Sequence, residues 1–405
     1  MPSLERKPLC IIGLGYVGLP LARAFTFAGF PVVGYDSDAA KVARLQADFQ
    51  PRGLTLTSSE DDLDGADTFI ICVPTPVDSA HRPDVTCLTS ACHTVGRHLR
   101  RGGMVVIESS VAPGCTEKVC LPIVESESGL GCPADFDMAY SPERVNPGDG
   151  QHTVESVVKV VAAVGDDGLD RAARLYSTVA HAGVHRAPSI RVAEAAKMLE
   201  NTQRDVNIAL MNECAMLFDS MGVSTTDVLA AARTKWNFLP FTPGLVGGHC
   251  IGVDPYYLMD AAQSAGQSAP LIRTAREVNN AVAPFVARKL MSKNPRRVLI
   301  LGVAYKPNVP DVRNSQSIAL AEILTSQGLT VDAIDPVADA RLCPMPLKNR
   351  PDGTYDAIVC AVRHDAFAAT VRNAIKSNLA DGGKVYDLAG FFTPAEANDM
   401  NIWKL

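Results

Sequence analysis

Residues 8–35, PLCIIGLGYVGLPLARAFTFAGFPVVGY, decide the fold of the first part of the chain. The apolar run from Pro8 to Ile12 predicts a strand that leads directly into the glycine-rich residues 13–18. Leu19 to Ala28 then predicts a helix, and Val32 to Tyr35 predicts a second, parallel strand. A strand, a glycine turn, a helix and a strand within about 30 residues form the mononucleotide-binding βαβ unit.

The glycine pattern in this turn, Gly13-x-Gly15-x-x-Gly18, has a physical reason at each position. The first glycine makes a tight turn, the second lets the backbone approach a pyrophosphate, and the third permits close packing of helix and strand. The start of the helix presents its free amides to the anion. The predicted cofactor contacts in this turn are Gly13, Gly15, Tyr16, Val17 and Gly18.

Asp36 follows Gly18 by eighteen residues, at the end of the predicted second strand. Its carboxylate is placed to accept hydrogen bonds from a ribose hydroxyl, and its charge repels the 2′-phosphate of NADP. The alternative for Asp36 is a helix N-cap or an exposed acid at a strand end. The sequence therefore predicts NAD as the cofactor, with Lys41 in the same part of its site.

Composition limits the class of protein. The chain has 405 residues, of which 47% are hydrophobic and 20% charged, so we expect a globular protein with two α/β units and connecting helices. The net charge of −6 and the lack of a basic block argue against nucleic acid as a partner. No uncharged apolar run reaches about 18 residues, so we expect no signal peptide, no membrane span and a cytoplasmic location.

The eleven cysteines do not suggest disulfides or a metal. Their spacing is scattered and none forms a C-x-x-C pair, so most are expected to be buried, inert thiols. Neither Cys87 with Cys92 nor Cys115 with Cys120 has the close ligand spacing of a zinc site, and no pair of histidines completes one. We therefore expect no metal.

The middle of the chain changes character. Further apolar runs at Thr68 to Val73, Gly103 to Glu108 and Val157 to Val164 extend the predicted sheet. Arg191 to Met221 then has helical periodicity without Pro or Gly, and predicts a long connecting helix. Trp236 to Leu258 is rich in Pro, Gly and aromatic residues, and predicts a long functional loop.

A second α/β domain closes the chain. A helix is predicted from about Pro270 to Lys293, followed by a strand from Arg297 to Gly302. The later elements are a helix at Ser315 to Gln327 and strands at Val331 to Ile334, Ala357 to Ala361 and Lys384 to Asp387. We therefore expect a domain at 1–190 that binds NAD, a central helical region at 191–293, and a second domain at 294–405.

The loop segment GLVGGHCIGVDPYYL, residues 244–258, is the most informative stretch for chemistry. A nucleophilic thiol needs an open approach, stabilisation of its thiolate and room for a tetrahedral adduct, and the glycines before Cys250 favour all of these. The alternative is a buried, inert cysteine. Adjacent side chains of an extended segment point opposite ways, so His249 is interpreted as a structural hydrogen-bonding residue rather than the base for Cys250.

The strand at Arg297 to Gly302 leads into GVAYKP, which lacks the dinucleotide glycine pattern. Lys306 and Arg313 lie near the carboxyl end of this strand, where open parallel sheets bind ligands, and either suits a phosphate or a uronate. The alternative for both is solvated surface charge. The second domain is thus predicted to bind something other than a dinucleotide.

Taken together, these motifs resemble the UDP-glucose/UDP-N-acetylhexosamine 6-dehydrogenase family over essentially the whole chain. The resemblance is carried by IIGLGYVGLPLA, VPTPVD, ESSVAPGCT, YSPERVNPG, AEAAKMLENTQRDVNIALMNE, GLVGGHCIGVDPYYL and GVAYKPNVPDVRNS. It implies two Rossmann-like, doubly wound domains joined by a long central helix, with NAD in the first and a UDP-sugar against the second. It also implies oxidation of the sugar C6 alcohol to a carboxylate with two NAD⁺, through a thiohemiacetal and a thioester on cysteine, and pairing into a dimer through the central helix.

The resemblance further implies roles for particular residues. Cys250 is the nucleophile, Lys197 and Asn201 stabilise the oxyanion from one face of a helix, and their spacing to Glu194 follows the family pattern. The implied water-activating residues are Asp254, Glu143 and Ser110, and Thr75 and Ser110 also touch NAD. The implied substrate contacts are Glu143, Arg144, Lys197, Asn201, Arg233, Gly247, Lys306 and Arg313, with Arg233 directed to the neighbouring subunit.

Departures from the family pattern bear on the substrate. UDP-glucose dehydrogenases commonly have Lys where this chain has Val253 and an acid where it has Pro147, so the resemblance favours the branch acting on UDP-N-acetylhexosamines. UDP-glucose and UDP-ManNAc are the alternatives, and surface polysaccharide synthesis is the implied purpose. Thr242 stands where similar proteins often have Arg, and the segment between Asp48 and Ser58 is shortened.

Two other functions compete with this interpretation. One is a two-electron dehydrogenase of the 6-phosphogluconate or hydroxyacyl type, which needs no active cysteine and forms one NADH per substrate. The other is a catalytically inactive UDP-sugar-binding regulator. The presence of Cys250, Lys197, Asn201 and Asp254 argues against an inactive protein.

Overall fold

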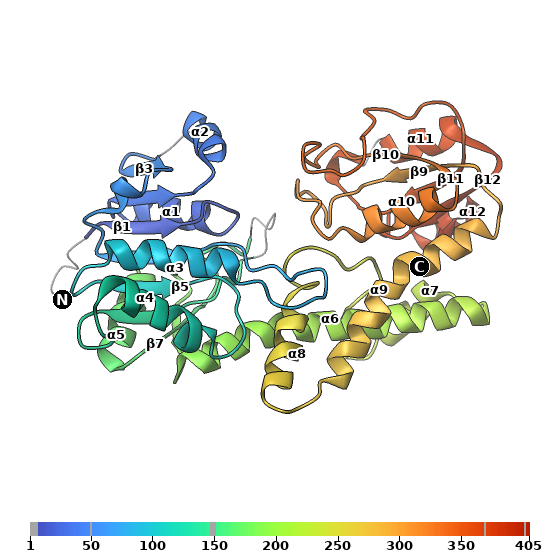
Figure 1. The fold of residues 1–405 in the computed structure, drawn as a ribbon. Helices are drawn as coiled ribbons and strands as arrows, with labels where there is room; N and C mark the ends of the chain where they lie inside the picture. Colours follow the sequence, from blue (N-terminus) through green and yellow to red (C-terminus); the bar gives the residue numbers. More distant parts are fainter. Residues whose placement is uncertain (1–6, 49–50, 146–150, 368–369, 401) are drawn as a thin grey trace. The chain divides into compact units, whose positions relative to one another are not determined.

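The computed structural model describes residues 7–48, 51–145, 151–367, 370–400 and 402–405. Their contacts divide the chain into two compact units. The first contains residues 1–200 and 256–267, and the second contains residues 201–255 and 268–405. Each unit is built around its own sheet (Figure 1).

The first unit contains an eight-stranded sheet in the order β3-β2-β1-β4-β5-β6-β7-β8. Neighbouring strands are parallel except that β7 runs antiparallel to β6. The strands are β1 (Leu9–Ile12), β2 (Val32–Tyr35), β3 (Leu54–Thr57), β4 (Thr68–Ile71), β5 (Met104–Ile107), β6 (Asp137–Tyr140), β7 (Lys159–Ala163) and β8 (Val184–Arg186). The first six follow the order of the doubly wound dinucleotide-binding fold, which confirms the predicted βαβ unit.

Helices cover both faces of this sheet because every strand of its centre is apolar on both sides. Cys10 and Ile12 of β1 belong to one buried cluster, and Leu9 and Ile11 belong to another on the opposite face. The helices of this unit are α1 (Gly18–Phe27), α2 (Ala39–Ala47), α3 (Thr86–His98), α4 (Leu121–Ser128), α5 (Asp166–Tyr176) and most of α8 (Asp254–Ser264), with single turns η1 (Glu60–Leu63) and η2 (Thr116–Cys120).

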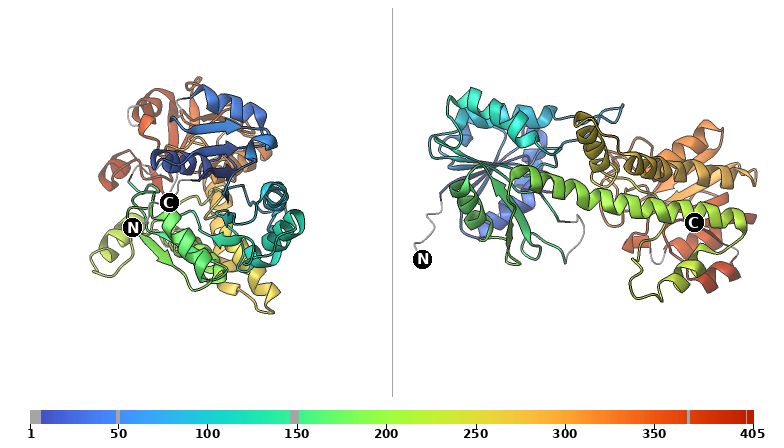
Figure 2. Two further views of the ribbon diagram at one scale, coloured as in Figure 1. Left: turned by 90° about the vertical axis from the view of Figure 1, so that its left-hand side faces the viewer. Right: turned by 90° about the horizontal axis from the view of Figure 1, so that it is seen from below.

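The long helix α6 (Ile190–Met221) was predicted almost to the residue. It has 32 residues, is unbroken, and contributes residues to both units (Figure 2). Its first turns carry Lys197 in the first unit, and Asn201 begins its part of the second unit. No helix among the described residues is long and apolar enough to cross a membrane.

The second unit contains a parallel five-stranded sheet in the order β10-β9-β11-β12-β13. Its strands are β9 (Arg297–Leu301), β10 (Thr330–Ile334), β11 (Tyr355–Cys360), β12 (Leu379–Asp387) and β13 (Trp403–Lys404). Its helices are α7 (Thr225–Ala232), α9 (Pro270–Met291), α10 (Gln316–Ser326), α11 (Thr370–Asn378) and α12 (Pro394–Asp399), with a single turn η3 (Asp365–Phe367). Val298 and Ile300 of β9 pack into one core, and Leu299 and Leu301 pack into a second on the other face. The prediction of two Rossmann-like domains and a long helix is therefore confirmed.

One predicted boundary was wrong. The loop expected from Trp236 to Leu258 ends at Asp254, where α8 begins. Pro255 occupies the second position of this helix, where its missing amide is not needed for a helical hydrogen bond. The sequence Asp-Pro at 254 and 255 is thus a helix start that the glycine-rich context obscured.

Candidate functional site

The glycine turn of the first unit has the geometry that a dinucleotide diphosphate requires. Gly13 has a φ of +93°, and a Cβ there would lie 2.8 Å from the carbonyl oxygen of Cys72. A Cβ on Gly18 would collide with the backbone of Gly13, so helix α1 packs against the turn only with glycine there. Above Gly15 the space is open, with nothing within 4 Å of an added Cβ. The backbone is therefore accessible where a diphosphate has to approach.

Asp36 lies at the carboxyl end of β2 and is held by several donors. Its Oδ2 accepts hydrogen bonds from the Leu14 amide at 2.9 Å and the Lys41 ammonium at 2.6 Å, and its Oδ1 accepts one from the Asp38 amide at 3.1 Å. Burial opposes ionisation of this carboxyl, but Lys41 and the two amides outweigh it and lower its pKa. Asp36 is therefore an ionised carboxylate at neutral pH, close to the glycine turn.

Two further residues predicted to contact NAD lie beside each other. The Thr75 hydroxyl donates a hydrogen bond to the carbonyl oxygen of Ser110 at 2.7 Å. Thr75 follows β4, and Ser110 follows the adjacent parallel strand β5. Both therefore belong to the carboxyl edge of the sheet, where open α/β sheets bind ligands.

Glu143 and Lys197 are brought together in the first unit. The Lys197 ammonium donates a hydrogen bond to the main-chain carbonyl oxygen of Glu143 at 2.6 Å, and the Lys197 side chain is almost fully buried. An exposed-helix interpretation of Lys197 is thus excluded. Arg144 pairs with Glu200 at 2.8 Å, and the Glu143 carboxylate accepts hydrogen bonds from the amides of Arg144 and Val145.

Glu194, one turn before Lys197 on α6, has a different task. Its buried carboxylate accepts hydrogen bonds from the main-chain amides of Gly114 and Thr116. This anchors the loop that follows Ser110 to the start of α6. Of the three predicted helix positions, Glu194 therefore anchors a loop.

In the second unit the predicted nucleophile lies at the start of a turn. The carbonyl oxygen of Cys250 accepts hydrogen bonds from the amides of Val253 at 3.0 Å and Asp254 at 2.9 Å. The buried Asp254 carboxylate accepts a hydrogen bond from the Asn201 amide group at 2.5 Å. Cys250, Asp254 and Asn201 are therefore linked by one short set of contacts.

His249 contacts different residues from those expected for a catalytic base. Its ring packs edge-on against Tyr305 with centroids 5.5 Å apart, and its Nδ1 lies 3.7 Å from the Asp311 carboxylate. The argument from an extended segment was wrong, because residues 248–253 form a turn. The reason is Gly248, whose φ of +86° starts the turn and whose missing Cβ leaves room for Tyr305.

The start of the cysteine loop is clamped by residues that the sequence did not single out. The Asn212 side chain accepts a hydrogen bond from the Gly244 amide at 2.8 Å and donates one to the Gly244 carbonyl oxygen at 3.1 Å. The same amide group donates to Asn279 of α9, which donates in turn to the buried Asp205. The available signal was a second asparagine, Asn212, about three turns after Asn201 on the same helix.

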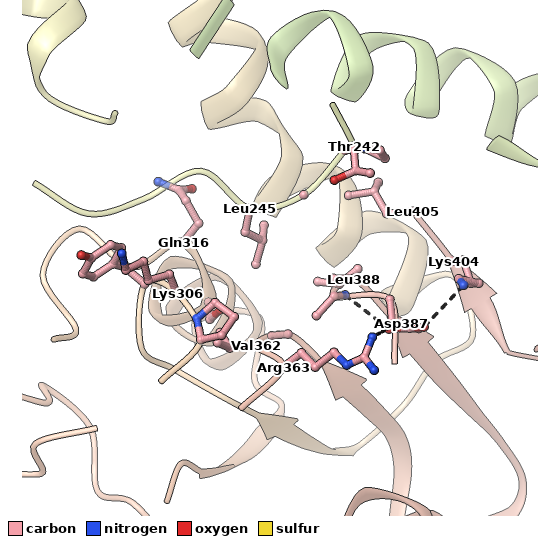
Figure 3. Close-up of a pocket in the computed structure, with 18 of the residues that line it drawn as sticks. Thr242, Leu245, Lys306, Gln316, Val362, Arg363, Asp387, Leu388, Lys404 and Leu405 are labelled. Carbon is pink, nitrogen blue, oxygen red and sulfur yellow. Dashed lines mark hydrogen bonds and ion pairs between the residues drawn. The ribbon is translucent and has the colours of Figure 1, made fainter. Parts of the chain in front are cut away.

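A cavity of about 510 Å³ lies in the second unit, at the carboxyl ends of β9, β11 and β12 (Figure 3). Lys306 and Arg233 line it, whereas Gly247 and Arg313 are not among its lining residues. Arg313 pairs instead with Asp311, with its Nε at 3.0 Å from the carboxylate. Gly247 is needed for close approach, since a Cβ there would collide with the carbonyl of Asn314.

The cavity also contains two cations that the sequence analysis missed. Arg363 follows β11 and donates a hydrogen bond to the carbonyl oxygen of Gly390 at 2.8 Å. Lys404 on β13 lies 3.8 Å from the buried Asp387 carboxylate. Both positions follow from strand order in the second sheet, which a single sequence does not reveal.

The turn after β9 is closed to a dinucleotide. The carboxylate of Asp335, at the end of β10, accepts hydrogen bonds from the amides of Val303 at 2.7 Å and Ala304 at 2.9 Å and from His364 Nε2 at 3.0 Å. Burial opposes its ionisation, yet these donors outweigh burial and lower its pKa strongly. Its other oxygen, Oδ1, accepts hydrogen bonds from the amides of Val337 and Ala338. Both carboxylate oxygens of Asp335 are therefore occupied by donors of the protein and are not available to a ribose hydroxyl.

No cluster of three or more His, Cys, Asp or Glu side chains suited to a metal ion is present in the part of the chain that the structure describes. Pro147, which the sequence analysis used to argue about the substrate, lies outside the described residues, as do residues 49 and 50 of the shortened segment. Thr242 lines the cavity of the second unit, and Val253 is buried.

The fold defines a protein with two Rossmann-type units, one with a glycine turn suited to a dinucleotide and the other with a cavity lined by cations. Comparison with known families makes the class specific. Profiles of the UDP-glucose/GDP-mannose dehydrogenase family match its NAD binding domain to residues 7–180, its central domain to 191–281 and its UDP binding domain to 299–394. The chain belongs to this family, and is an NAD-dependent nucleotide-sugar dehydrogenase.

Individual relatives agree over their whole length. The UDP-N-acetyl-D-glucosamine 6-dehydrogenase of Pseudomonas aeruginosa is 40% identical, with 97% of this chain and 99% of that protein covered. The enzyme of the same name from Salmonella typhi is 39% identical, covering 99% of this chain and all of that protein. The solved structure of a UDP-D-ManNAc dehydrogenase from Pyrococcus horikoshii is 31% identical and superposes with a TM-score of 0.86 over 98% of each chain.

Proposed function

We propose that this protein oxidises the C6 hydroxyl of a UDP-N-acetylhexosamine, UDP-GlcNAc or UDP-GalNAc, to the uronate through a thioester on Cys250. The observation that carries the proposal is the linked turn of Cys250, Asp254 and Asn201 in a chain similar to UDP-N-acetyl-D-glucosamine 6-dehydrogenases. UDP-ManNAc and UDP-glucose are the alternative substrates. The proposed setting is cytoplasmic synthesis of a surface polysaccharide.

The cofactor fits the residues present. NAD⁺, when bound, accepts a hydride in each of the two oxidations. Gly13, Gly15 and Gly18 leave the backbone open to its diphosphate, and Asp36 presents an ionised carboxylate beside them. The further proposed contacts are Tyr16, Val17, Lys41, Thr75 and Ser110. The three predicted domains, 1–190, 191–293 and 294–405, divide the tasks into cofactor binding, catalytic loop and UDP binding.

The side chains of the protein carry the rest of the reaction. After the first oxidation, the Cys250 thiolate adds to the C6 aldehyde, and the hydrogen-bonding groups of Lys197 and Asn201 stabilise the oxyanion that forms. Loss of a second hydride leaves a thioester. Water then adds to its carbonyl carbon, assisted by Glu143 and held by Asp254 and Ser110, and the C–S bond breaks to return the thiolate. The products are one uronate and two NADH.

We assign the cavity of the second unit to the UDP moiety. Its cations Lys306 and Arg233, joined by Arg363 and Lys404, suit a diphosphate because both its phosphates are charged at neutral pH. Arg144, Gly247 and Arg313 are the remaining proposed substrate residues. Arg363 and Lys404 extend the predicted set, since they meet Lys306 in the same cavity.

NAD⁺ is expected to be strongly preferred over NADP⁺, because the ionised Asp36 repels a 2′-phosphate. Asp36→Ser should narrow the ratio of kcat/KM values for the two cofactors, since it also frees the Lys41 ammonium to meet the phosphate. Asp38→Asn is the matched control: its carboxylate caps helix α2 through the Lys41 amide. Equal kcat/KM for both cofactors in the wild-type protein would contradict this role of Asp36.

A UDP-N-acetylhexosamine is expected to have a higher kcat/KM than UDP-glucose, because the uncharged Val253 is buried in the cysteine turn where UDP-glucose dehydrogenases carry Lys. A panel of UDP-sugars followed by NADH absorbance, with the NADH formed per sugar counted, checks this. Two NADH per sugar exclude the two-electron alternative, and turnover of any UDP-hexose excludes an inactive regulator. UDP-glucose as the best substrate would refute the assignment.

The protein is expected to be at least a dimer that pairs through α6. Leu199, Leu210, Leu217 and Met221 are exposed, and at roughly 100° per residue they fall within about 40° of one another on the helix. Leu210→Glu combined with Leu217→Glu should shift sedimentation to the monomer, whereas Leu342→Glu, at an exposed leucine elsewhere, should not. A fully active wild-type monomer at assay concentration would refute the dimer. Arg233 lines the cavity of its own chain, so its assignment to that cavity replaces the predicted reach to a partner.

A further inference from the structure

A buried ion pair lies beneath the predicted water-activating residue of the first unit. The Lys159 ammonium at the start of β7 donates a hydrogen bond to Glu108 Oε2 at 2.7 Å. The two side chains are 2% and 0% exposed. The Tyr176 hydroxyl at the end of α5 donates to the other oxygen of Glu108 at 2.5 Å. Both oxygens of Glu108 are therefore satisfied.

Packing alone does not explain this pair. Removing an ammonium and a carboxylate from water is costly, and apolar side chains of similar volume generally stabilise a core as well or better. The neighbouring strand residues Val160 and Val161 show that this part of the sheet accepts apolar side chains. The charge on Lys159 therefore calls for a partner beyond the pair.

Glu143 is that partner. Its Oε2 lies 3.8 Å from the Lys159 ammonium, while its Oε1 is occupied by the main-chain amides of Arg144 and Val145. Burial lowers the pKa of Lys159, but the charges of Glu108 and Glu143 outweigh burial and raise it, so the ammonium persists at neutral pH. The Glu143 carboxylate is thus held by main-chain donors on one oxygen and by a fixed cation near the other.

Other groups around Glu143 do not replace this cation. Lys197 contacts the main-chain carbonyl of Glu143, and Arg144 pairs with Glu200. The Cys72 thiol, which burial gives a strongly raised pKa, stays neutral. Among the described residues, Lys159 is therefore the buried cation that lies beside the Glu143 carboxylate.

We infer that Lys159 is a positioning residue for Glu143, and that Glu108 and Tyr176 exist to hold Lys159 in place. The inference rests on the proposed role of Glu143 as the base of thioester hydrolysis. Lys159 fixes the carboxylate from one side, so that Glu143 takes the proton of the attacking water while the hydroxide adds to the thioester carbon. The proton then resides on Glu143, and the electrons of the C–S bond leave with the thiolate.

The test compares a variant that loses the ion pair with one that keeps it. Lys159→Met combined with Glu108→Gln removes the cation and leaves no unpaired buried charge, whereas Tyr176→Phe keeps both charges and removes only a hydrogen bond to Glu108. Acyl release is followed by rapid quench after the first turnover, as a function of pH. An opposite charge within about 4–6 Å shifts a carboxyl titration by roughly one to three units. The acid limb of the pH–rate profile for acyl release should therefore move up by about one pH unit or more in the double variant. It should stay where it is in Tyr176→Phe, which keeps the cation beside Glu143.

The inference is decided by whether the acid limb moves in the double variant and not in the control. A purely structural pair would change both variants alike, and an unchanged limb in the double variant would also overturn the role of Lys159. If the Met side chain prevents folding, the double variant Lys159→Gln with Glu108→Gln replaces it in the same experiment. Adding the double change to Glu143→Gln should slow acyl release no further, because Lys159 acts through Glu143. Normal acyl release in Glu143→Gln itself would instead refute the proposed function.

Discussion

Cys250→Ala should form no uronate, with a loss of at least about 10⁴-fold in the rate of acid production. The thiol is the atom that holds C6 between the two oxidations, so without it no thioester exists to hydrolyse. The turn that carries Cys250 is fixed by main-chain hydrogen bonds to Val253 and Asp254, so the alanine side chain should leave it in place. Product analysis by mass spectrometry together with NADH absorbance measures the loss.

A second cysteine provides the matched control for this variant. Cys87 lies on α3 in the first unit and is exposed, so Cys87→Ala tests whether removal of any accessible thiol slows the enzyme. It should retain wild-type rates. Uronate formation by Cys250→Ala at more than a few per cent of the wild-type rate would remove the thioester from the mechanism.

The sequence predicted the long elements better than the short ones. The glycine turn and α6 were predicted because each has a pattern with one physical solution: three glycines at fixed spacing, and 32 residues without a helix breaker. Strands β3 and β6 were missed because their sequences, LTLT and DMAY, lack the continuous apolar run of β1 and β5, which are equally short. Strand β6 is stabilised by its neighbours β5 and β7 rather than by its own pattern. Such strands depend on pairing partners far away in the chain.

The site shows the same division. Cys250, Asn201 and Asp254 were each predicted to be site residues, with separate roles, and the structure places them in contact through a turn and one hydrogen bond. Lys159 was part of an apolar run that predicted a strand, and no neighbouring residue in the sequence indicates a function for its charge. Its role depends on Glu108, 51 residues earlier, which directly follows β5, a strand far from β7 in the sequence.

Electrostatics explain why two similar sheets bind different ligands. In the first unit Asp36 accepts hydrogen bonds from three donors, which are the Leu14 amide of the glycine turn, the Asp38 amide and the Lys41 ammonium. In the second unit Asp335 accepts from two turn amides, two further amides and the buried His364. The amides of the turn after β9 are therefore already hydrogen-bonded within the protein. The cations that line the neighbouring cavity suit a different anion.

Glu143→Gln should complete both hydride transfers and then stall as an acyl-enzyme. The amide keeps the size of the side chain, and its oxygen can still accept the Arg144 amide, but it cannot take a proton from water. Loss of such a base typically slows the assisted step by about 10²–10⁴-fold, enough for the intermediate to accumulate. Formation and hydrolysis of the thioester thus depend on different residues.

Intact-mass spectrometry of Glu143→Gln mixed with substrate and NAD⁺ should show one acyl adduct, which proteolytic digestion maps to the Cys250 peptide. A burst of two NADH per active site should precede the stall, because both oxidations come before hydrolysis. Glu127→Gln, which alters an exposed carboxylate on α4 paired with His93, is the control and should turn over normally without an adduct. Unmodified Glu143→Gln with normal turnover would refute the role of Glu143, and an adduct on another residue would refute that of Cys250.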